Sequence, residues 1–510
     1  TNKTPTTPPS TMNKKLHTAL LPPFRRAFSS TTFAPQASFA VDNPYTGQVH
    51  ANITMRNENE AADMMARSEQ VQQDWSQVPL PERIAVCQRF IDVWTSKGSA
   101  DKAFVEQTAV DISSQMGKPL NYARGEVGGM LERANAMVSM APEALASKDL
   151  PKEGFLRRIV KEPVGVVLTI APWNYPLLTA VNSILPAILS GNSVMIKHSE
   201  RTPLTGDALA KAFSMAGAPA DLVQSLHCSH DVTRSVIQHP ATGFVSFTGS
   251  VTGGRAVFQA AAAGCETSQR FIDTTVELGG KDALYCAEDA DVESAVAGAV
   301  DGSMFNAGQS CCGIERAYVH ESVYDEFIER ATNLVTRQGE YVLGDPMQEG
   351  TNMGPMAQPG AIATLTSHVE QASARGATVL CGGNSTHDEA GNGRFFEPTL
   401  IANCNHDMDV VREESFGPLL AIMKVSGDDE AIAKINDSQY GLTSALFTSN
   451  VDRASSMAPK LKTGTVFMNR CDYLDPELPW SGHGNTGKGV SLSMHGFQSF
   501  SRLKGFHFKL

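Results

Sequence analysis

Cys311 lies in a loop of small and polar residues, Asn306-Ala307-Gly308-Gln309-Ser310-Cys311-Cys312, where a thiol can act as a nucleophile. A carboxylate stands upstream in the glycine-rich segment Glu277-Leu278-Gly279-Gly280-Lys281. A base in such a turn can activate water in a later step. Together they predict covalent catalysis at sulfur, in which a thioester forms on Cys311 and is then hydrolysed. From these residues alone, either cysteine of the pair could instead be a buried core thiol, and Glu277 could be a surface charge.

Attack of sulfur on a carbonyl also needs neutral donors for the oxyanion. Asn174 offers a side-chain amide directly after the apolar run 164–170, which reads as a strand buried on both faces. Active sites of α/β sheets lie at such strand ends. The other reading is that Asn174 only caps the following helix.

A glycine-rich turn, Thr248-Gly249-Ser250-Val251-Thr252-Gly253-Gly254, is expected to join a strand to a helix. Free N–H groups and the helix dipole would then face a pyrophosphate, although the segment is not G-x-G-x-x-G. Lys197 and Glu200 follow another expected strand, where an adenosine ribose lies in a dinucleotide fold. A carboxylate there accepts hydrogen bonds from ribose hydroxyls and repels a 2′-phosphate, so NAD is expected rather than NADP.

These segments need an alternating scaffold. The residues predict strands at 164–170, 193–197 and 244–247, each followed by a helix, with Thr202 as the cap of the second. Apolar residues at helical spacing precede them at 58–75, 81–97 and about 101–145, and the alternation resumes in the C-terminal third. This rhythm predicts a doubly wound parallel sheet in an α/β protein.

The whole chain has 510 residues, enough for two to four domains. Its formal charge of −12 argues against nucleic acid or an anionic membrane as partner. Nine cysteines without a C-x-x-C pair or a zinc-like cluster indicate a reducing compartment and no structural metal. The longest apolar run, 177–196, contains several polar residues and reads as a buried helix and strand, with no membrane span.

The first 41 residues contain no Asp or Glu but include Lys14, Lys15, Arg25 and Arg26 among Ser, Thr, Leu and Phe. Counted from Met12, this segment resembles a mitochondrial presequence with a processing site at 26–30, and residues 1–11 read as an upstream extension. The expectation is a disordered leader over 1–40 and a mitochondrial matrix location, with the cytoplasm as the alternative if the segment is only a disordered tail.

The combination of segments resembles the aldehyde dehydrogenase superfamily over residues 40–510. The segments around Glu277 and Cys311 are similar to its glutamate and cysteine signatures, and Pro172-Trp173-Asn174 is similar to its oxyanion segment. The resemblance implies that Cys311 is the nucleophile, Glu277 the base and Asn174 the oxyanion donor. The implied nucleotide-binding residues are Trp173, Lys197, Glu200, Thr248, Gly249, Ser250, Gly254, Leu278, Glu414 and Phe416.

The implied fold is a dinucleotide-binding domain (41–150 and 164–275), an α/β catalytic domain (276–485) and a small β oligomerisation element (151–163 and 486–510). The implied activity is NAD-dependent oxidation of a small-molecule aldehyde to an acid by a homodimer or homotetramer. Two alternatives are a coenzyme A-acylating enzyme, against which Glu277 counts, and a non-catalytic homologue.

The residues do not decide which aldehyde is the substrate. Asn182 stands where several members of the superfamily place a bulky aromatic residue, which implies a wider or more polar tunnel. Met304 and the segment 479–484 also depart from the family pattern. An acidic trio, Asp472, Asp475 and Glu477, favours a cationic aminoaldehyde, whereas Arg470 favours a semialdehyde. If all four are solvated loop charges, a plain aliphatic aldehyde is equally compatible.

Overall fold

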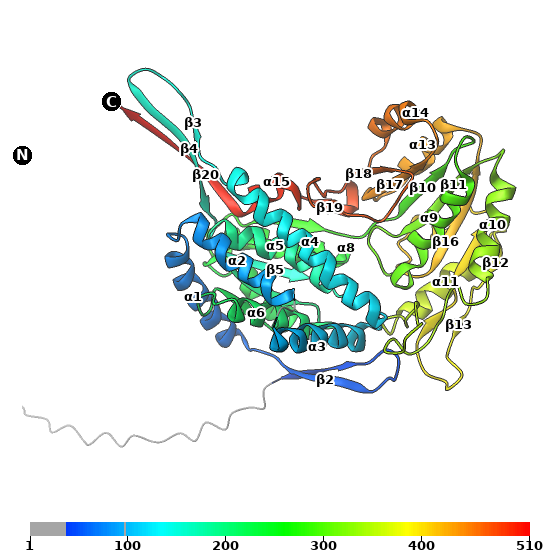
Figure 1. Cartoon of the computed structure of the whole chain (residues 1–510), viewed down its shortest axis with the longest axis horizontal. Coiled ribbons are helices and arrows are strands. Elements are labelled where there is room, and N and C mark those ends of the chain that lie inside the picture. The colour runs from blue at the N-terminus through cyan, green and yellow to red at the C-terminus, as the bar shows by residue number, and fades with distance from the viewer. Residues whose placement is uncertain (1–36, 96–97) are drawn as a thin grey trace, which may run out of the picture. The chain divides into compact units, whose positions relative to one another are not determined.

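The structure, a computed structural model, describes residues 37–95 and 98–510 (Figure 1). The predicted presequence and its processing site lie outside the described residues. Regular structure begins with the antiparallel pair β1 (Ser38–Asp42) and β2 (Val49–Thr54). Strand β1 therefore starts inside the segment 1–40 that was predicted to be a disordered leader, because residues 38–42 find hydrogen-bonding partners in β2.

A six-stranded sheet forms the first half of the fold. Its strands are parallel except for β19, and their spatial order is β19 (Gly487–Lys488), β9 (Asp273–Glu277), β8 (Thr242–Thr248), β5 (Val166–Ala171), β6 (Ser193–His198) and β7 (Val223–Ser225). The chain runs outward from β5 to β7, then returns to the other side of β5 as β8 and β9. This reversal is the switch point of a doubly wound sheet, where ligands bind beyond the carboxyl ends of the strands.

Helices cover both faces of this sheet. One face carries α5 (Pro176–Leu189) and α6 (Pro203–Met215), backed by α2 (Leu80–Trp94), α3 (Ser99–Met116) and α4 (Leu120–Ala144). The other face carries α1 (Glu58–Trp75), α7 (His230–Ile237) and α8 (Val251–Thr267). Strands β5 and β6 are buried along their whole length, as predicted from their uninterrupted apolar runs.

A seven-stranded sheet forms the second half. Its order is β12 (Thr378–Cys381), β15 (Thr399–Ala402), β16 (Leu419–Val425), β11 (Ile314–His320), β10 (Asp282–Cys286), β17 (Thr443–Phe447) and β18 (Thr465–Met468), all parallel except β12. Its helices include α9 (Val292–Met304), α10 (Tyr324–Thr336), α11 (Ala361–Ala374), α12 (Asp409–Arg412), α13 (Asp428–Asn436) and α14 (Val451–Met457). Met304, one of the departures from the family pattern, is buried in the core of this half.

The third sheet is small and is built from the chain's last strand. β20 (Ser501–Lys509) pairs antiparallel with β4 (Phe155–Pro163), which pairs with β3 (Lys148–Asp149). In Figure 1 these strands extend away from the helices. They correspond to the predicted oligomerisation element, except that β19 belongs to the six-stranded sheet and α15 (Ser493–Gly496) contacts α4.

Local signals mostly match the elements. Thr202 does occupy the N-cap position of α6, but it makes no side-chain capping bond: its hydroxyl contacts Nδ1 of His198 at 3.1 Å instead. The Thr202 side chain therefore makes a buried contact with His198 and does not cap α6. Within the described chain, no helix is long and apolar enough to cross a membrane.

Candidate active site

Three of the predicted residues lie at the carboxyl ends of adjacent strands. Asn174 stands in the turn between β5 and α5, Thr248 is the last residue of β8, and Glu277 is the last residue of β9. Because these strands are parallel neighbours, their ends meet at one edge of the sheet. The topology alone therefore gathers an amide, a hydroxyl and a carboxylate.

The cysteine loop comes from the other half of the fold. It follows the 3₁₀ turn Phe305–Gly308 and precedes β11. Asn306, Ala307 and Gly308 have φ of 55°, 56° and 69°, so three successive residues lie in the left-handed region. At Gly308 an added Cβ would come within 2.2 Å of the Gly417 carbonyl oxygen, so only glycine fits there. Such a costly backbone persists only where surrounding contacts enforce it, which is common at active sites.

Asn174 is joined to this loop by its side-chain amide. Its Nδ2 donates to the carbonyl of Gln309 at 3.1 Å, two residues before Cys311. Asn306 Nδ2 donates to the same carbonyl at 3.2 Å and to the Asn174 carbonyl at 3.3 Å. An amide nitrogen carries two hydrogens, so Asn174 keeps a second donor for an oxyanion formed at Cys311.

The turn that carries Asn174 is held by a buried ion pair. Lys118 Nζ lies 2.5 Å from a Glu126 carboxylate oxygen and donates to the Asn174 carbonyl at 2.8 Å. The other Glu126 oxygen accepts from the N–H groups of Leu177 and Leu178, at 2.8 and 3.3 Å, at the start of α5. Both charged side chains are almost fully buried. The pair therefore fixes the entry of the chain into α5 and with it the amide of Asn174.

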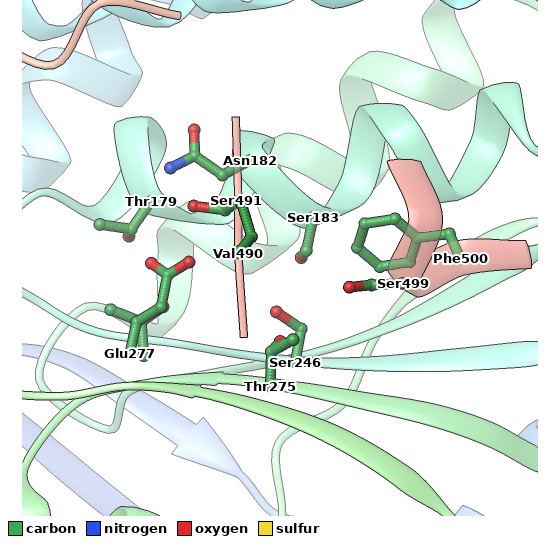
Figure 2. Close-up of a pocket in the computed structure, with 11 residues that line it drawn as sticks. Thr179, Asn182, Ser183, Ser246, Thr275, Glu277, Val490, Ser491, Ser499 and Phe500 are labelled. Carbon is green, nitrogen blue, oxygen red and sulfur yellow. The ribbon is translucent and has the colours of Figure 1, made fainter. Parts of the chain in front are cut away.

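Cys311 and Glu277 line one cavity. Its other lining residues include Leu278, Thr248 and Asn182, together with Trp480, Ser481 and Gly482 of the segment 479–484. A smaller pocket adjoins Glu277, and Figure 2 shows the carboxylate directed toward Thr179 and Ser491 among further hydroxyl groups. The predicted nucleophile and base thus line the same cavity.

The two adjacent cysteines lie in different environments. Cys311 is partly exposed and lines the cavity, whereas Cys312 is buried. Cys312 Sγ donates to the Asp472 carboxylate at 2.8 Å. Its contact with the Cys311 thiol, together with burial, raises the pKa of Cys312 well above the ordinary value, so this thiol stays protonated. Of the two thiols, the accessible Cys311 is therefore the candidate nucleophile.

Glu277 is a partly buried carboxylate at the wall of both cavities. Burial raises its pKa, and the nearby groups Ser491, Arg133 and Thr248 oppose that shift. A carboxylate with a raised pKa is a stronger base, which suits the activation of water near neutral pH.

The predicted pyrophosphate turn does join β8 to α8, but the N–H groups of Gly249 and Gly253 are bonded within the chain. Ser250 is the N-cap of α8 and accepts from the Gly253 N–H at 3.1 Å, and the helix points its N-terminus at the carboxyl edge of the sheet. Gly249 N–H donates to the Glu277 carbonyl at 3.0 Å. A Cβ at Gly254 would come within 2.4 Å of Leu278 Cδ2, so glycine is needed for this close helix–strand packing.

Lys197 and Glu200 lie at the end of β6, beside the switch point. Lys197 is buried and makes no ion pair within the described residues, while Glu200 is exposed. An unpaired buried ammonium next to an accessible carboxylate fits a ribose with two hydroxyl groups.

Glu414 and Phe416 approach from the second sheet. Gly280 N–H donates to Glu414 at 3.0 Å, and burial beside Glu315 raises the pKa of Glu414 to about 8. Phe416, at φ 51°, packs edge-to-face with Trp173 at a centroid distance of 5.5 Å. These two predicted nucleotide-binding residues therefore contact Gly280 and Trp173, which come from the segments around Glu277 and Asn174.

A second buried ion pair stabilises the turn that carries Ser415 and Phe416. Lys281 pairs with Glu315 and donates to Ser415 Oγ at 3.1 Å. Glu315 accepts from the N–H groups of Ser415 and Phe416, at 2.8 and 3.0 Å.

Of the four loop charges considered for substrate choice, only Asp472 contacts the cysteine loop. Burial raises its pKa to about 7. Arg470 is exposed and stacks on the Tyr473 ring at 4.0 Å, and Asp475 accepts from the Glu477 N–H at 2.9 Å. Asn182 lines both cavities.

Sequence reasoning missed Lys118, Glu126, Asn306 and Arg133. Asn306 stands inside the cysteine segment, where its place beside a glycine was a usable signal. The other three are charged residues on or before a helix, and nothing in their spacing shows that the fold buries them.

Comparison with known proteins agrees with this geometry. The model of the aldehyde dehydrogenase family matches residues 32–506. A succinate-semialdehyde dehydrogenase [NADP(+)] of Deinococcus radiodurans is 33% identical over 92% of this chain and 94% of its own length. A betaine aldehyde dehydrogenase of Rhizobium leguminosarum bv. trifolii is 31% identical, over 90% of this chain and 92% of that protein.

Solved structures give the same result. The NAD⁺ complex of an aldehyde dehydrogenase from Bacillus cereus superposes with a TM-score of 0.86, at 27% identity, covering 93% of this chain and 94% of that one. The chain belongs to the aldehyde dehydrogenase family. It is an oxidoreductase that oxidises an aldehyde with a nicotinamide nucleotide, and its fold is the expected α/β arrangement of parallel sheets.

Proposed function

We propose that Cys311, Asn174 and Glu277 carry the oxidation of an aldehyde to a carboxylic acid through a thioester on Cys311. The observation that carries this assignment is the single cavity lined by Cys311 and Glu277, beside the loop to which the Asn174 amide is bonded. No other cysteine shares a cavity with a carboxylate in this way among the cavities described above.

The steps follow from these groups. The Cys311 thiolate attacks the carbonyl carbon, and the Asn174 amide with the Cys311 backbone N–H stabilises the oxyanion. The bound nucleotide supplies the hydride acceptor. Loss of hydride leaves a thioester on Cys311. Glu277 takes a proton from water, the hydroxide attacks the thioester, and the acid leaves as the sulfur regains its charge.

The test is Cys311→Ala. It is expected to abolish NADH formation with every aldehyde while nucleotide binding, measured by quenching of protein fluorescence, is retained. Full dehydrogenase activity of this variant would refute the assignment. Added coenzyme A should change neither rate nor product, because Glu277 provides water as the acceptor.

For the cofactor, we propose NAD in preference to NADP. The support is the accessible Glu200 carboxylate near the buried Lys197 ammonium, since a carboxylate there repels a 2′-phosphate. The relatives do not decide, because one is named for NADP(+) and a solved neighbour holds NAD⁺. Glu200→Ser is expected to raise kcat/KM for NADP and lower it for NAD; unchanged ratios would contradict the role of Glu200.

For location and assembly, we propose the mitochondrial matrix and a homodimer or homotetramer. The first rests on the acid-free, basic composition of residues 1–41. The second rests on β20, where Leu503 and Phe508 are 71% and 54% exposed on a three-stranded sheet. Light scattering should give a multiple of the chain mass, and Leu503→Asp with Phe508→Asp should lower it.

Import into isolated mitochondria tests whether residues 1–40 act as a mitochondrial leader, with a chain lacking residues 1–40 as the control.

A further inference from the structure

Arg133 is a buried cation in α4 that the mechanism above does not use. Only 7% of it is exposed. Its Nη1 donates to the Leu178 carbonyl at 2.8 Å and to Asn182 Oδ1 at 3.2 Å, both on α5. Leu178 and Asn182 lie four and eight residues after Asn174, so the guanidinium contacts the first two turns of the helix that follows the catalytic turn.

No carboxylate of the described chain lies within ion-pair distance of Arg133. The buried lysines behave differently: Lys118 pairs with Glu126, and Lys281 pairs with Glu315. Arg316 also lacks a carboxylate within ion-pair distance, but its Nε, Nη1 and Nη2 donate to the carbonyls of Lys281, Lys434 and Ile435 and to the Tyr318 hydroxyl. Nε and Nη2 of Arg133 donate to none among the described residues. A buried guanidinium that has no direct ion pair and has donors left over is costly, and it fits a partner that arrives from outside the chain.

Arg133 also fixes the orientation of Asn182. A guanidinium only donates, so the Asn182 atom that faces it must be the oxygen. The amide nitrogen is then turned the other way. In Figure 2 it lies on the side of Thr179 and Glu277, and Asn182 lines both cavities with Glu277. The cavity therefore has a fixed hydrogen-bond donor with a positive charge behind it.

We propose that Arg133 and Asn182 select an aldehyde that carries a second, anionic oxygen group, so that the substrate class is the semialdehydes. This proposal rests on the function proposed above. The Asn182 amide donates to the carboxylate of the substrate, and Arg133 supplies the opposite charge in a site where water is scarce. A substrate with a quaternary ammonium group would place two cations together.

The acids near Arg133 do not remove this preference. Glu126, Glu277 and Asp472 all act on Arg133 electrostatically, but none lies within 4 Å of its nitrogens, and Glu126 is already paired with Lys118. Asp472 is already the acceptor of the Cys312 thiol. Arg470, the cation that the sequence suggested for a semialdehyde, is exposed and stacked on Tyr473, so Arg133 takes the role that was expected of it.

The experiment compares three aldehydes of similar size: succinic semialdehyde (anionic), butanal (neutral) and betaine aldehyde (cationic). The wild type should show the highest kcat/KM for succinic semialdehyde. Arg133→Met should lower that value by about 10- to 100-fold, the loss of one charge-assisted contact, while butanal changes by less than about threefold. Arg470→Met is the matched control, an arginine of the same region without a cavity contact, and should leave the order of the three substrates unchanged.

Arg133→Lys keeps the charge and serves where Arg133→Met does not fold. It should retain the preference for the anionic aldehyde at a reduced level, and succinate should inhibit the wild type competitively against butanal and Arg133→Met more weakly. An equal loss with all three aldehydes would overturn the proposal and make Arg133 a packing residue. A preference for betaine aldehyde in the wild type would overturn it as well. Absence of activity with every aldehyde in the wild type would instead contradict the proposed function itself.

Discussion

Cys311 and Cys312 are neighbours in sequence, yet their side chains have different surroundings. Cys311 faces the cavity, whereas Cys312 is buried against the carboxyl of Asp472. Since the thiolate is the reactive form, the raised pKa of Cys312 makes it unreactive. Residue identity alone gives both the same chemistry, and the environment separates them.

Alkylation should show the same difference. We expect iodoacetamide at neutral pH to modify Cys311 first, as read by peptide mass spectrometry, and Cys312→Ala to keep at least about a tenth of wild-type kcat, since a buried substitution of this size costs stability and not the nucleophile. Faster labelling of Cys312 than of Cys311 would contradict the assignment.

Replacement of Glu277 separates the two halves of the reaction. Glu277→Gln should keep a burst of NADH from the first turnover and lower steady-state kcat by about 10²- to 10⁴-fold, because only thioester hydrolysis needs the base. In the wild type, kcat should fall as the pH drops through the raised pKa of Glu277, since protonation removes the base; in Glu277→Gln this limb should disappear. Loss of the burst would mean that Glu277 acts earlier, on the thiol.

At the scale of elements, two buried lysine–glutamate pairs hold two turns from opposite sides of the site. Lys118 and Glu126 hold the β5–α5 turn with Asn174, and Lys281 and Glu315 hold the turn with Ser415 and Phe416. Their similar burial makes each pair a control for the other. The Lys118–Glu126 pair is expected to affect stabilisation of the oxyanion, and the Lys281–Glu315 pair is expected to affect nucleotide binding.

Neutral double variants test this division without leaving a lone buried charge. Lys118→Met with Glu126→Gln should lower hydrolysis of p-nitrophenyl acetate, which needs an oxyanion donor and no nucleotide, by about 10- to 100-fold. Alkylation of Cys311 by iodoacetamide, which forms no oxyanion, should stay within about twofold. Lys281→Met with Glu315→Gln should leave the esterase rate unchanged and raise KM for the nucleotide. Parallel losses of esterase rate and alkylation in the first variant would indicate general disruption.

The sequence predicted the elements well where one local pattern decides them. The run 164–170 gave β5 and the turn 248–254 gave the start of α8, because apolar continuity and glycine placement are local properties. Burial of Lys118 and Arg133 was not predictable from local patterns. It arises because α4 and the turn before it pack on α5 and its preceding turn, which lie more than 40 residues later in the chain. The cap role of Thr202 failed for a similar reason, because its hydroxyl met His198 in the folded core.

At the scale of the whole molecule, several acids are buried with raised pKa values. Burial raises the pKa of Asp282 and of Asp472 to about 7 and that of Glu414 to about 8. The native state therefore keeps protons that the unfolded chain releases at lower pH. Stability falls with rising pH wherever the native state binds more protons, so these groups favour the folded state below their ordinary pKa and lose that effect as the pH rises toward about 8.

Thermal unfolding of the nucleotide-free protein should show this trend. Glu414→Gln should flatten the decrease in Tm between pH 6 and about pH 8, whereas the exposed Glu349→Gln should follow the wild type. A wild-type Tm that rises over this interval, or equal slopes in Glu414→Gln and Glu349→Gln, would show that Glu414 is ionised in the folded protein throughout.

The most direct test of the account is to trap the covalent intermediate. Glu277→Gln mixed with an aldehyde and NAD, quenched in acid and digested, should yield the peptide of residues 306–312 with one acyl group on the sulfur of Cys311. An acyl group on Cys312, or an NADH burst without any acylated cysteine, would contradict the claim that oxidation proceeds through a thioester at residue 311.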